Sequence, residues 1–209
     1  IFSIIFYRIF KRSTRSLKLN IFLRYYYIRI GLILVGAFGA YSLGANNIAN
    51  VMGVFTHSIE LEPLNFYFFV INKTQILFLL GSLAIALGIF TYSKNVMTTV
   101  GNDIYKISPA TALIVVLSSS FVLFLFGSVS LQNLLISLNL PTIPLVPVSS
   151  SQAVVGAIIG IGLGKGDTNI NFTKLKSISF GWLLTPIMSL ALSYVSLFFM
   201  QNVFMQSVY

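Results

Sequence analysis

The chain has 209 residues, of which 56% are hydrophobic and only 8% are charged. Soluble domains are about 25% charged, so these few charges cannot cover a water-facing surface, and a lipid bilayer is the solvent that fits the composition. The net charge of +9 lies in short segments between apolar runs, which favours membrane topology over nucleic-acid binding as its explanation. The absence of cysteine from the sequence excludes disulfides, thiolate catalysis and cysteine-based metal sites. We therefore expect an all-α integral membrane protein without a nucleic-acid partner.

The first 29 residues are predicted to precede the membrane domain. Residues 1–10 are typical of the end of a helix that begins upstream, so we expect this chain to be the C-terminal part of a longer protein. Seven cations follow in a basic stretch: Arg8, Lys11, Arg12, Arg15, Lys18, Arg24 and Arg29. We interpret residues 1–29 as a helix end with a basic cytoplasmic loop, and residues 30–209 as the membrane domain. The basic charge is first a topology signal and second a contact for anionic lipid.

About five apolar segments are predicted to cross the membrane, namely residues 30–57, 76–92, 109–127, 148–164 and 178–200. The first is predicted to be a helix broken at residues 44–47. The fourth is a short, glycine-rich half-span, at the lower limit of a crossing length. Residues 94–106 are expected to form a polar connection, and Pro186 lies inside the last segment. Short and broken hydrophobic segments are the best sequence indication of a transporter's binding site.

The distribution of charge predicts the orientation of these segments. With the first basic stretch in the cytoplasm, Glu60 and Glu62 fall outside the cell. The later basic clusters then lie inside, as the positive-inside rule requires: Lys94 with Lys106, and Lys165 with Lys174 and Lys176. We expect a multi-pass protein of the plasma membrane in this orientation.

The first polar motif reads Gly-Ala-Asn-Asn-Ile-Ala-Asn-Val-Met-Gly, from Gly44 to Gly53. Asparagines at membrane depth are costly without hydrogen-bond partners. Gly44 permits a break, and Asn46 is predicted to cap a half-helix that begins near Asn47. Asn47 and Asn50 are three residues apart and share a helix face, where an amide can meet either a cation or an oxyanion.

The second polar motif reads Pro-Val-Ser-Ser-Ser-Gln-Ala, from Pro147. The proline discourages helix before it, and a serine can cap the helix that follows. The free N–H groups of that helix and the neighbouring hydroxyls predict an anion site, made by Ser149, Ser150, Ser151 and Gln152. Gly156, Gly160 and Gly164 recur every four residues, a spacing that lets another helix approach closely.

A purely structural role is the alternative to a binding site for the two polar motifs. Asparagine and serine in membrane helices often serve only as hydrogen bonds between helices, and for either motif alone this interpretation stays open. Their joint presence favours one shared site. His57 is interpreted as an interfacial residue, since the sequence has no second histidine for a metal site. Asp103 and Asp167 are expected in solvated cytoplasmic loops.

The two polar motifs resemble signatures of the inorganic phosphate transporter (PiT) family. That family carries a GAND-x-A-N-x-x-G signature and a later PVSTTHA-x-VG signature in each of two inverted repeats. This chain reads GANNIANVMG at residues 44–53 and PVSSSQAVVG at residues 147–156. The stretch around Thr99-Val100-Gly101 and the helix with Trp182 and Pro186 also resemble the family. The resemblance covers nearly the whole chain and implies the second repeat of such a transporter.

What the resemblance implies is uptake of inorganic phosphate coupled to Na⁺ or H⁺, at a site between the two motifs of both repeats. By this analogy the anion and cation ligands are Asn46, Asn47, Asn50, Ser149, Ser150 and Ser151. Asn47 stands where the family usually has Asp, and Gln152 where it usually has His. The first change removes a charged cation ligand and the second removes a titratable group, so the coupling ion stays open.

Several other functions are alternatives to phosphate transport. The runner-up is a sulfate permease of the same family, and a further alternative is a structural subunit that does not transport. A membrane enzyme acting on lipid phosphate would need a base or metal ligands at membrane depth, and the four acidic residues are all expected in loops, so we predict no enzyme and no cofactor. The missing N-terminal repeat is the expected partner, because such sites form between repeats, unless a homodimer replaces it.

Overall fold

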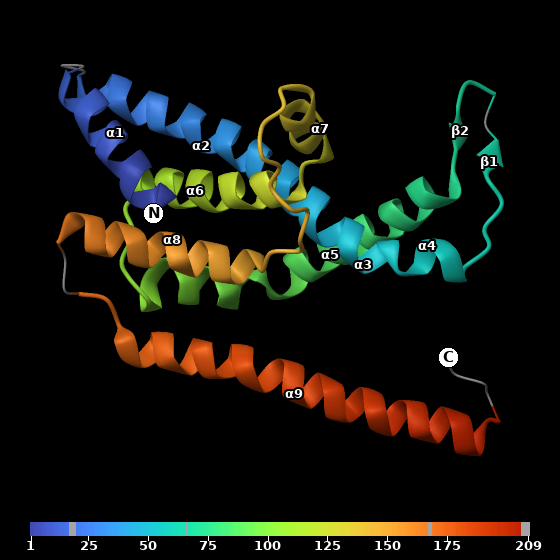
Figure 1. Cartoon of the computed structure of the whole chain (residues 1–209). Helices are drawn as coiled ribbons and strands as arrows, with labels where there is room; N and C mark the ends of the chain where they lie inside the picture. Colours follow the sequence, from blue (N-terminus) through green and yellow to red (C-terminus); the bar gives the residue numbers. More distant parts are fainter. Residues whose placement is uncertain (17–19, 66, 167–168, 206–209) are drawn as a thin grey trace. The chain divides into compact units, whose positions relative to one another are not determined.

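Apolar helices make up most of the structure, a computed structural model that describes residues 1–16, 20–65, 67–166 and 169–205, without the side chains of Arg15 and Ser16 (Figure 1). Among these residues, four helical segments are long and apolar enough to cross a membrane: residues 21–58, 73–103, 109–127 and 172–203. The chain divides into two units, Ile1–Ile170 and Asn171–Tyr209, which are described separately below. The expected all-helical membrane protein is confirmed at this level, with four candidate spans in place of the five predicted.

The first span differs from its prediction at its start and in the middle, and ends within one residue of the predicted position. Helix α1 covers Phe2–Ser16, and α2 covers Ile21–Leu43, so Arg24 and Arg29 lie in a helix and not in a loop. The chain then continues through a π-helical turn η1, Gly44–Ile48, into the short helices α3, Ala49–Gly53, and α4, Phe55–Ser58. Gly44 keeps right-handed helical angles. The expected break is therefore a widened turn inside a continuing helix, which absorbs one extra residue without freeing a whole turn of backbone groups.

A small hairpin and a long helix follow. Strands β1, Leu64–Asn65, and β2, Val70–Ile71, pair antiparallel, with Leu64 opposite Ile71. Helix α5 covers Lys73–Thr98, and its N-terminus is closed by Gln75, whose side chain accepts from the backbone N–H of Asn72 at 2.9 Å. A second π-turn, η2 at Thr99–Asp103, extends this helix. The predicted polar connection at residues 94–106 is thus largely helical. Asp103 lies in η2, exposed, and Asp167 lies outside the described residues.

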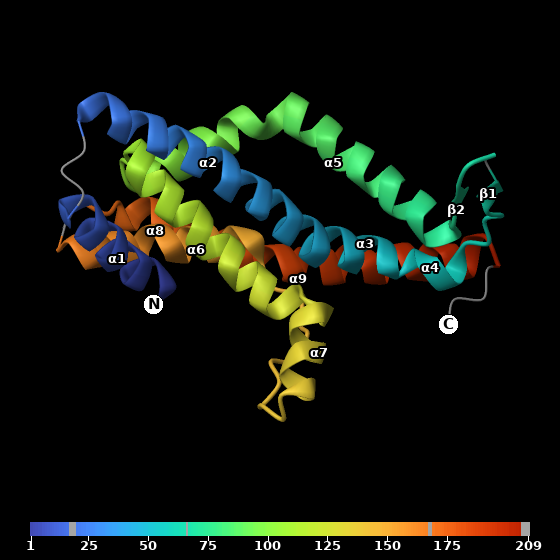
Figure 2. The ribbon, with the colours of Figure 1, turned by 90° about the horizontal axis from the view of Figure 1, so that it is seen from above.

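The centre of the first unit is built on α6, Pro109–Gly127, and α8, Ser150–Lys165. Helix α6 packs against α2 and α8, and α1 packs against both α6 and α8. Both views show α2 and α6 side by side, whereas α7, Val129–Ser137, projects from the bundle (Figure 2). In α6 and α8 the largest fully buried apolar side chains are Ile114, Ile158 and Ile161. Most other helical faces of the unit expose large apolar side chains, as expected of a surface solvated by lipid.

The glycine-rich segment is helix α8, whose 16 residues fall short of a full crossing. A Cβ on Gly160 would overlap the Ser3 hydroxyl of α1, and one on Gly164 would lie 3.6 Å from Ile4. Helix α1 therefore lies against α8 at these two glycines, most tightly at Gly160. Gly156 is exposed and has no such neighbour within 4 Å, so it does not share this packing role.

The second unit consists of helix α9, Phe172–Val203, which runs through Pro186 as predicted. Its N-terminus is capped by Asn171, whose side chain accepts from the backbone N–H of Lys174 at 3.0 Å. Proline inside a helix removes one backbone hydrogen bond, a loss that membrane helices tolerate when hydroxyls or neighbouring helices satisfy the freed groups.

Candidate functional site

The two polar motifs meet in space although 102 residues separate them. The side-chain amide of Asn46 pairs in both directions with the backbone of Val148. Its Nδ2 donates to the Val148 carbonyl at 2.6 Å, and its Oδ1 accepts from the Val148 N–H at 3.1 Å. This paired geometry satisfies a backbone donor and acceptor that the extended segment before α8 leaves open. Asn46 thus fixes the second motif against the first.

Asn47 links this pair to the start of α8. Asn46 Nδ2 also donates to Asn47 Oδ1 at 2.7 Å, and Asn47 Nδ2 reaches the Ser150 hydroxyl at 3.4 Å. Both hydrogens of the Asn46 amide are therefore engaged within the protein, and the side chain is only 3% exposed. Asn46 is inside η1 and does not cap a half-helix, so that prediction is wrong: its side chain bonds Val148 and the Asn47 side chain, and no backbone N–H of the following turn.

Asn50 bonds back along its own helix. Its side-chain amide donates to the backbone carbonyl of Asn46, one turn earlier. A π-turn interrupts the regular pattern of backbone hydrogen bonds in an α-helix. The Asn50 side chain donates to one of the backbone carbonyls of this turn. Gly44 and Gly53 bound the motif, and neither has a close packing neighbour. At Gly127 a Cβ would lie in van der Waals contact with Asn46, 3.7 Å from its Cβ, and at Gly81 of α5 a Cβ would overlap the Met52 side chain at 2.8 Å.

The start of α8 is built as predicted. Pro147 lies in the irregular segment before the helix, and Ser149 is the N-cap, with extended backbone angles and a hydroxyl that accepts from the Gln152 N–H at 3.4 Å. The hydroxyls of Ser149 and Ser151 lie 3.1 Å apart, and both residues and Gln152 are exposed. A helix N-terminus with open hydroxyls beside it can bind an oxyanion through its free N–H groups and its positive dipole end.

A cavity of about 150 Å³ lies beside the paired motifs. It is bounded by the first motif, the end of α6 and the segment before α8: Ala45, Asn46, Ala49, Asn50, Phe126, Gly127, Leu145, Val146 and Pro147. Ser149, Ser150, Ser151 and Gln152 do not line it. The structure therefore brings Asn46, Asn47 and Ser150 together, and leaves the Ser149–Ser151 pair on an adjoining open face.

Two contributors to this site escaped the sequence analysis, namely Val148 and Gly127. Val148 acts through its backbone, which no side-chain pattern can indicate. Gly127 ends an apolar helix directly before Ser128, the N-cap of α7. That position signals a helix end, but not the approach of Asn46.

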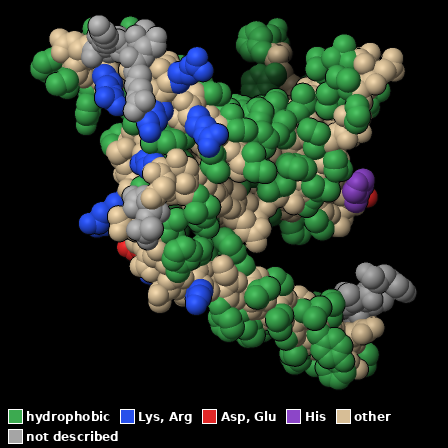
Figure 3. All heavy atoms as spheres, turned by 60° about the vertical axis from the view of Figure 1, so that its left-hand side comes forward, with side chains coloured by type: hydrophobic (Ala, Val, Ile, Leu, Met, Phe, Trp, Pro, Cys, Tyr) green, Lys and Arg blue, Asp and Glu red, His purple; other side chains and the backbone are tan. Residues whose placement is uncertain are grey.

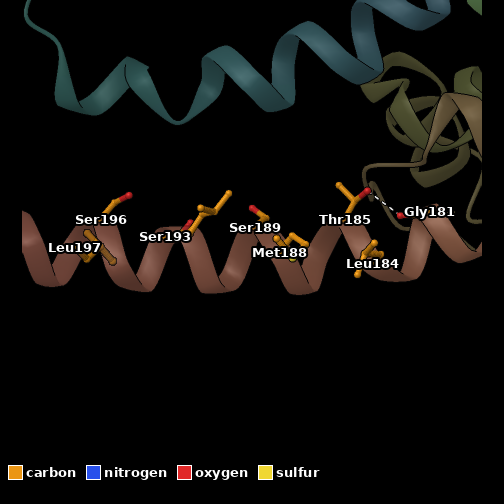
Figure 4. Close-up of a pocket in the computed structure, with 9 residues that line it drawn as sticks. Gly181, Leu184, Thr185, Met188, Ser189, Ser193, Ser196 and Leu197 are labelled. Atoms are coloured by element: carbon orange, nitrogen blue, oxygen red, sulfur yellow. Dashed lines mark hydrogen bonds between the residues drawn. The ribbon is translucent and has the colours of Figure 1, made fainter.

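A separate hollow of about 730 Å³ follows one face of α9 in the second unit (Figure 4). Residues at four-residue spacing line it, among them Gly181, Thr185, Ser189 and Ser193, and the Thr185 hydroxyl donates to the Gly181 carbonyl at 2.7 Å. Small residues at this spacing are typical of helix packing faces in membranes. Neither polar motif contributes to it, so it is not the candidate site.

The sequence matches the phosphate transporter family over residues 4–193. The chain belongs to this family. Because it is a family of transporters, the prediction of no enzyme is confirmed, and so is the family resemblance inferred from the two motifs.

Individual relatives agree with this assignment at low identity. A protein of Methanocaldococcus jannaschii named "putative phosphate permease" is 29% identical over 168 residues, which cover 80% of this chain and 46% of that protein. Proteins of the same name from Haemophilus influenzae and Chlamydia trachomatis are 26% and 25% identical, covering 74% and 82% of this chain but 33% and 36% of their own lengths. The chain thus spans between a third and a half of these relatives. No solved structure matches it significantly.

Proposed function

We propose that the chain forms one half of a permease that moves inorganic phosphate across the plasma membrane, with the paired motifs as part of its substrate site. The observation that carries the proposal is the two-way pairing of the Asn46 amide with Val148, which brings both family motifs to one place. The Asn47 amide reaches the Ser150 hydroxyl at 3.4 Å, so the start of α8 also lies against the asparagine motif.

The residues divide into two roles in this proposal. Asn46 is a positioning residue, since its amide hydrogens are already used within the protein. The oxyanion is held by the N-terminus of α8 and by the hydroxyls of Ser149, Ser150 and Ser151, with Gln152 beside them. Asn47 and Asn50 lie on the first motif's side and offer amide oxygens to a coupling cation, Na⁺ being the ion that such neutral oxygen ligands suit.

The second half of the site comes from an inverted repeat upstream or from a second copy of this chain. Sites of this kind form between repeats, so we expect no transport by residues 1–209 alone. An upstream repeat of this kind would supply the carboxylate ligand for the coupling cation, which Asn47 cannot provide.

The decisive experiment is uptake of labelled phosphate into proteoliposomes by the full-length protein, with an imposed sodium or proton gradient and unlabelled sulfate as competitor. Gradient-dependent uptake that resists sulfate supports the proposal and identifies the coupling ion. Uptake abolished by sulfate, together with accumulation of labelled sulfate, would establish the alternative that Asn47 and Gln152 mark a changed substrate.

Phosphate uptake by two matched triple variants distinguishes a transporter from a structural subunit that does not transport. Changing Ser149, Ser150 and Ser151 to alanine removes the proposed anion hydroxyls, while changing Ser189, Ser193 and Ser196 removes three hydroxyls from α9. Loss of uptake with the first set alone supports the site. Equal uptake by both variants, with normal assembly, contradicts it.

A further inference from the structure

A second polar cavity lies far from the paired motifs, at the end of the first unit where α1 ends, α2 begins and α8 ends. Its volume is about 210 Å³, and it is lined by three cations from three helices: Lys11, Arg24 and Lys165. None of the ten residues that line it is acidic. Lys and Arg side chains gather visibly at this end of the unit, where α1 is followed by α2, whereas apolar side chains dominate much of the visible face beyond it (Figure 3). The cavity therefore concentrates positive charge.

Two of these cations, Lys11 and Lys165, lie against neutral partners. Lys165 Nζ donates to the Thr111 hydroxyl at 3.1 Å and lies 5.8 Å from the centre of the Tyr7 ring. Lys11 Nζ lies 5.8 Å from the centre of the same ring. One aromatic ring thus attracts two ammonium groups, whose mutual repulsion is unfavourable until an anion joins them. Ser108, Thr111 and Thr14 add hydroxyls to the lining.

An apolar cavity of about 280 Å³ adjoins the basic one. The two share Phe10, Thr14 and Arg24 in their linings, and the remainder of the apolar cavity is formed by Ser13, Tyr27, Ile28 and Leu113. A free inorganic anion would use only the basic cavity. A ligand with a phosphate at one end and hydrocarbon at the other fits both, with Arg24 at the boundary.

We propose that these two cavities form a binding site for an anionic phospholipid. Its phosphate lies among Lys11, Arg24 and Lys165, and its apolar part lies against Phe10, Tyr27 and Leu113. Helix α8 separates this site from the paired motifs by about 22 Å, taking 1.5 Å of rise per residue between Ser150 and Lys165. The lipid site is therefore distinct from the proposed transport site, and either can exist without the other.

The test measures how much labelled phosphatidic acid the full-length protein retains after purification from phosphatidylcholine bilayers that contain a minor fraction of it. The double variant K11Q/R24Q removes two lining charges. Its matched control, R12Q/R29Q, removes the same charge from the same two helices at exposed positions that line neither cavity. We expect retention to fall at least about tenfold in the first and to stay near wild type in the second, because each lost charge-assisted contact is worth roughly tenfold or more.

Two further measurements keep the result decisive if the double variant assembles poorly. Ser13→Phe fills the apolar cavity without changing charge, and K165Q removes the third cation; each is expected to lower retention several-fold. Equal retention by all variants and the control overturns the proposal. So does binding of inorganic phosphate that depends on Lys11 and Arg24 in a protein that retains no phosphatidic acid.

Discussion

Asn46 and Val148 form a two-way hydrogen-bonded pair, in which a buried side-chain amide takes the place of a backbone partner. The pair joins a π-turn in one helix to the extended segment that leads into another. This arrangement determines where the N-terminus of α8 lies relative to the asparagine motif. The Asn46 side chain thus helps to hold the start of α8 against the asparagine motif.

Replacing Asn46 by alanine should destabilise the protein. The change leaves the N–H and carbonyl of Val148 without this partner, at about 1–3 kcal/mol for each unsatisfied buried group. The measurement is the free energy or midpoint of unfolding of the purified protein in detergent. Asn202→Ala is the control, because it removes an asparagine that bonds only a carbonyl of its own helix, Phe198, at an exposed position. Similar midpoints for both variants would show that the pair contributes little.

Asn47→Asp should increase the dependence of phosphate uptake on sodium. The carboxylate can still accept from Asn46 Nδ2, and the Ser150 hydroxyl can turn to donate, so the local geometry should survive while a charged cation ligand is added. Uptake measured against sodium concentration should then show half-saturation at a lower concentration, by roughly tenfold for one added charged contact. A sodium response identical to that of the wild type would argue that Asn47 faces no cation.

Ser149→Ala should weaken both stability and phosphate affinity. Loss of an N-cap costs about 0.5–2 kcal/mol, and the same hydroxyl is a proposed anion donor. Asn171→Ala removes the cap of α9 and serves as the control: it should lower stability to a similar degree with no change in the KM for phosphate. An unchanged KM in Ser149→Ala would restrict this serine to its capping role.

Gly160→Leu should disrupt the packing of α1 on α8. Even a Cβ here overlaps Ser3, which is 2% exposed, and overpacking of this kind costs about 1–3 kcal/mol. Gly156→Leu places the same side chain on the same helix where no neighbour lies within 4 Å. The midpoint of thermal unfolding should fall for the first variant and hold or rise for the second, because leucine favours helix over glycine. A loss confined to Gly156→Leu would contradict this account of the interface.

Much of the helical layout could be predicted because membrane helices are local structures. Their backbone hydrogen bonds close within each segment, so apolar length and capping residues indicate where a helix lies. A serine cap on the helix after Pro147 and the helix through Pro186 were both predicted on this basis. The ends of helices were less accurate, since α2 and α5 extend through residues whose charge or polarity suggested loops.

Composition and local pattern were enough to indicate a lipid-solvated surface, the helical class and the two motifs of the family. The packing of the helices was needed to show that the buried Asn46 amide pairs with Val148, that Gly44 begins a π-turn and not a break, and that three cations distant in sequence line one cavity. The physical reason is the distance along the chain over which each effect acts. Hydrophobicity and capping act within a few residues, whereas a side-chain amide pairs with whatever backbone the packing of other helices brings within about 3 Å of it.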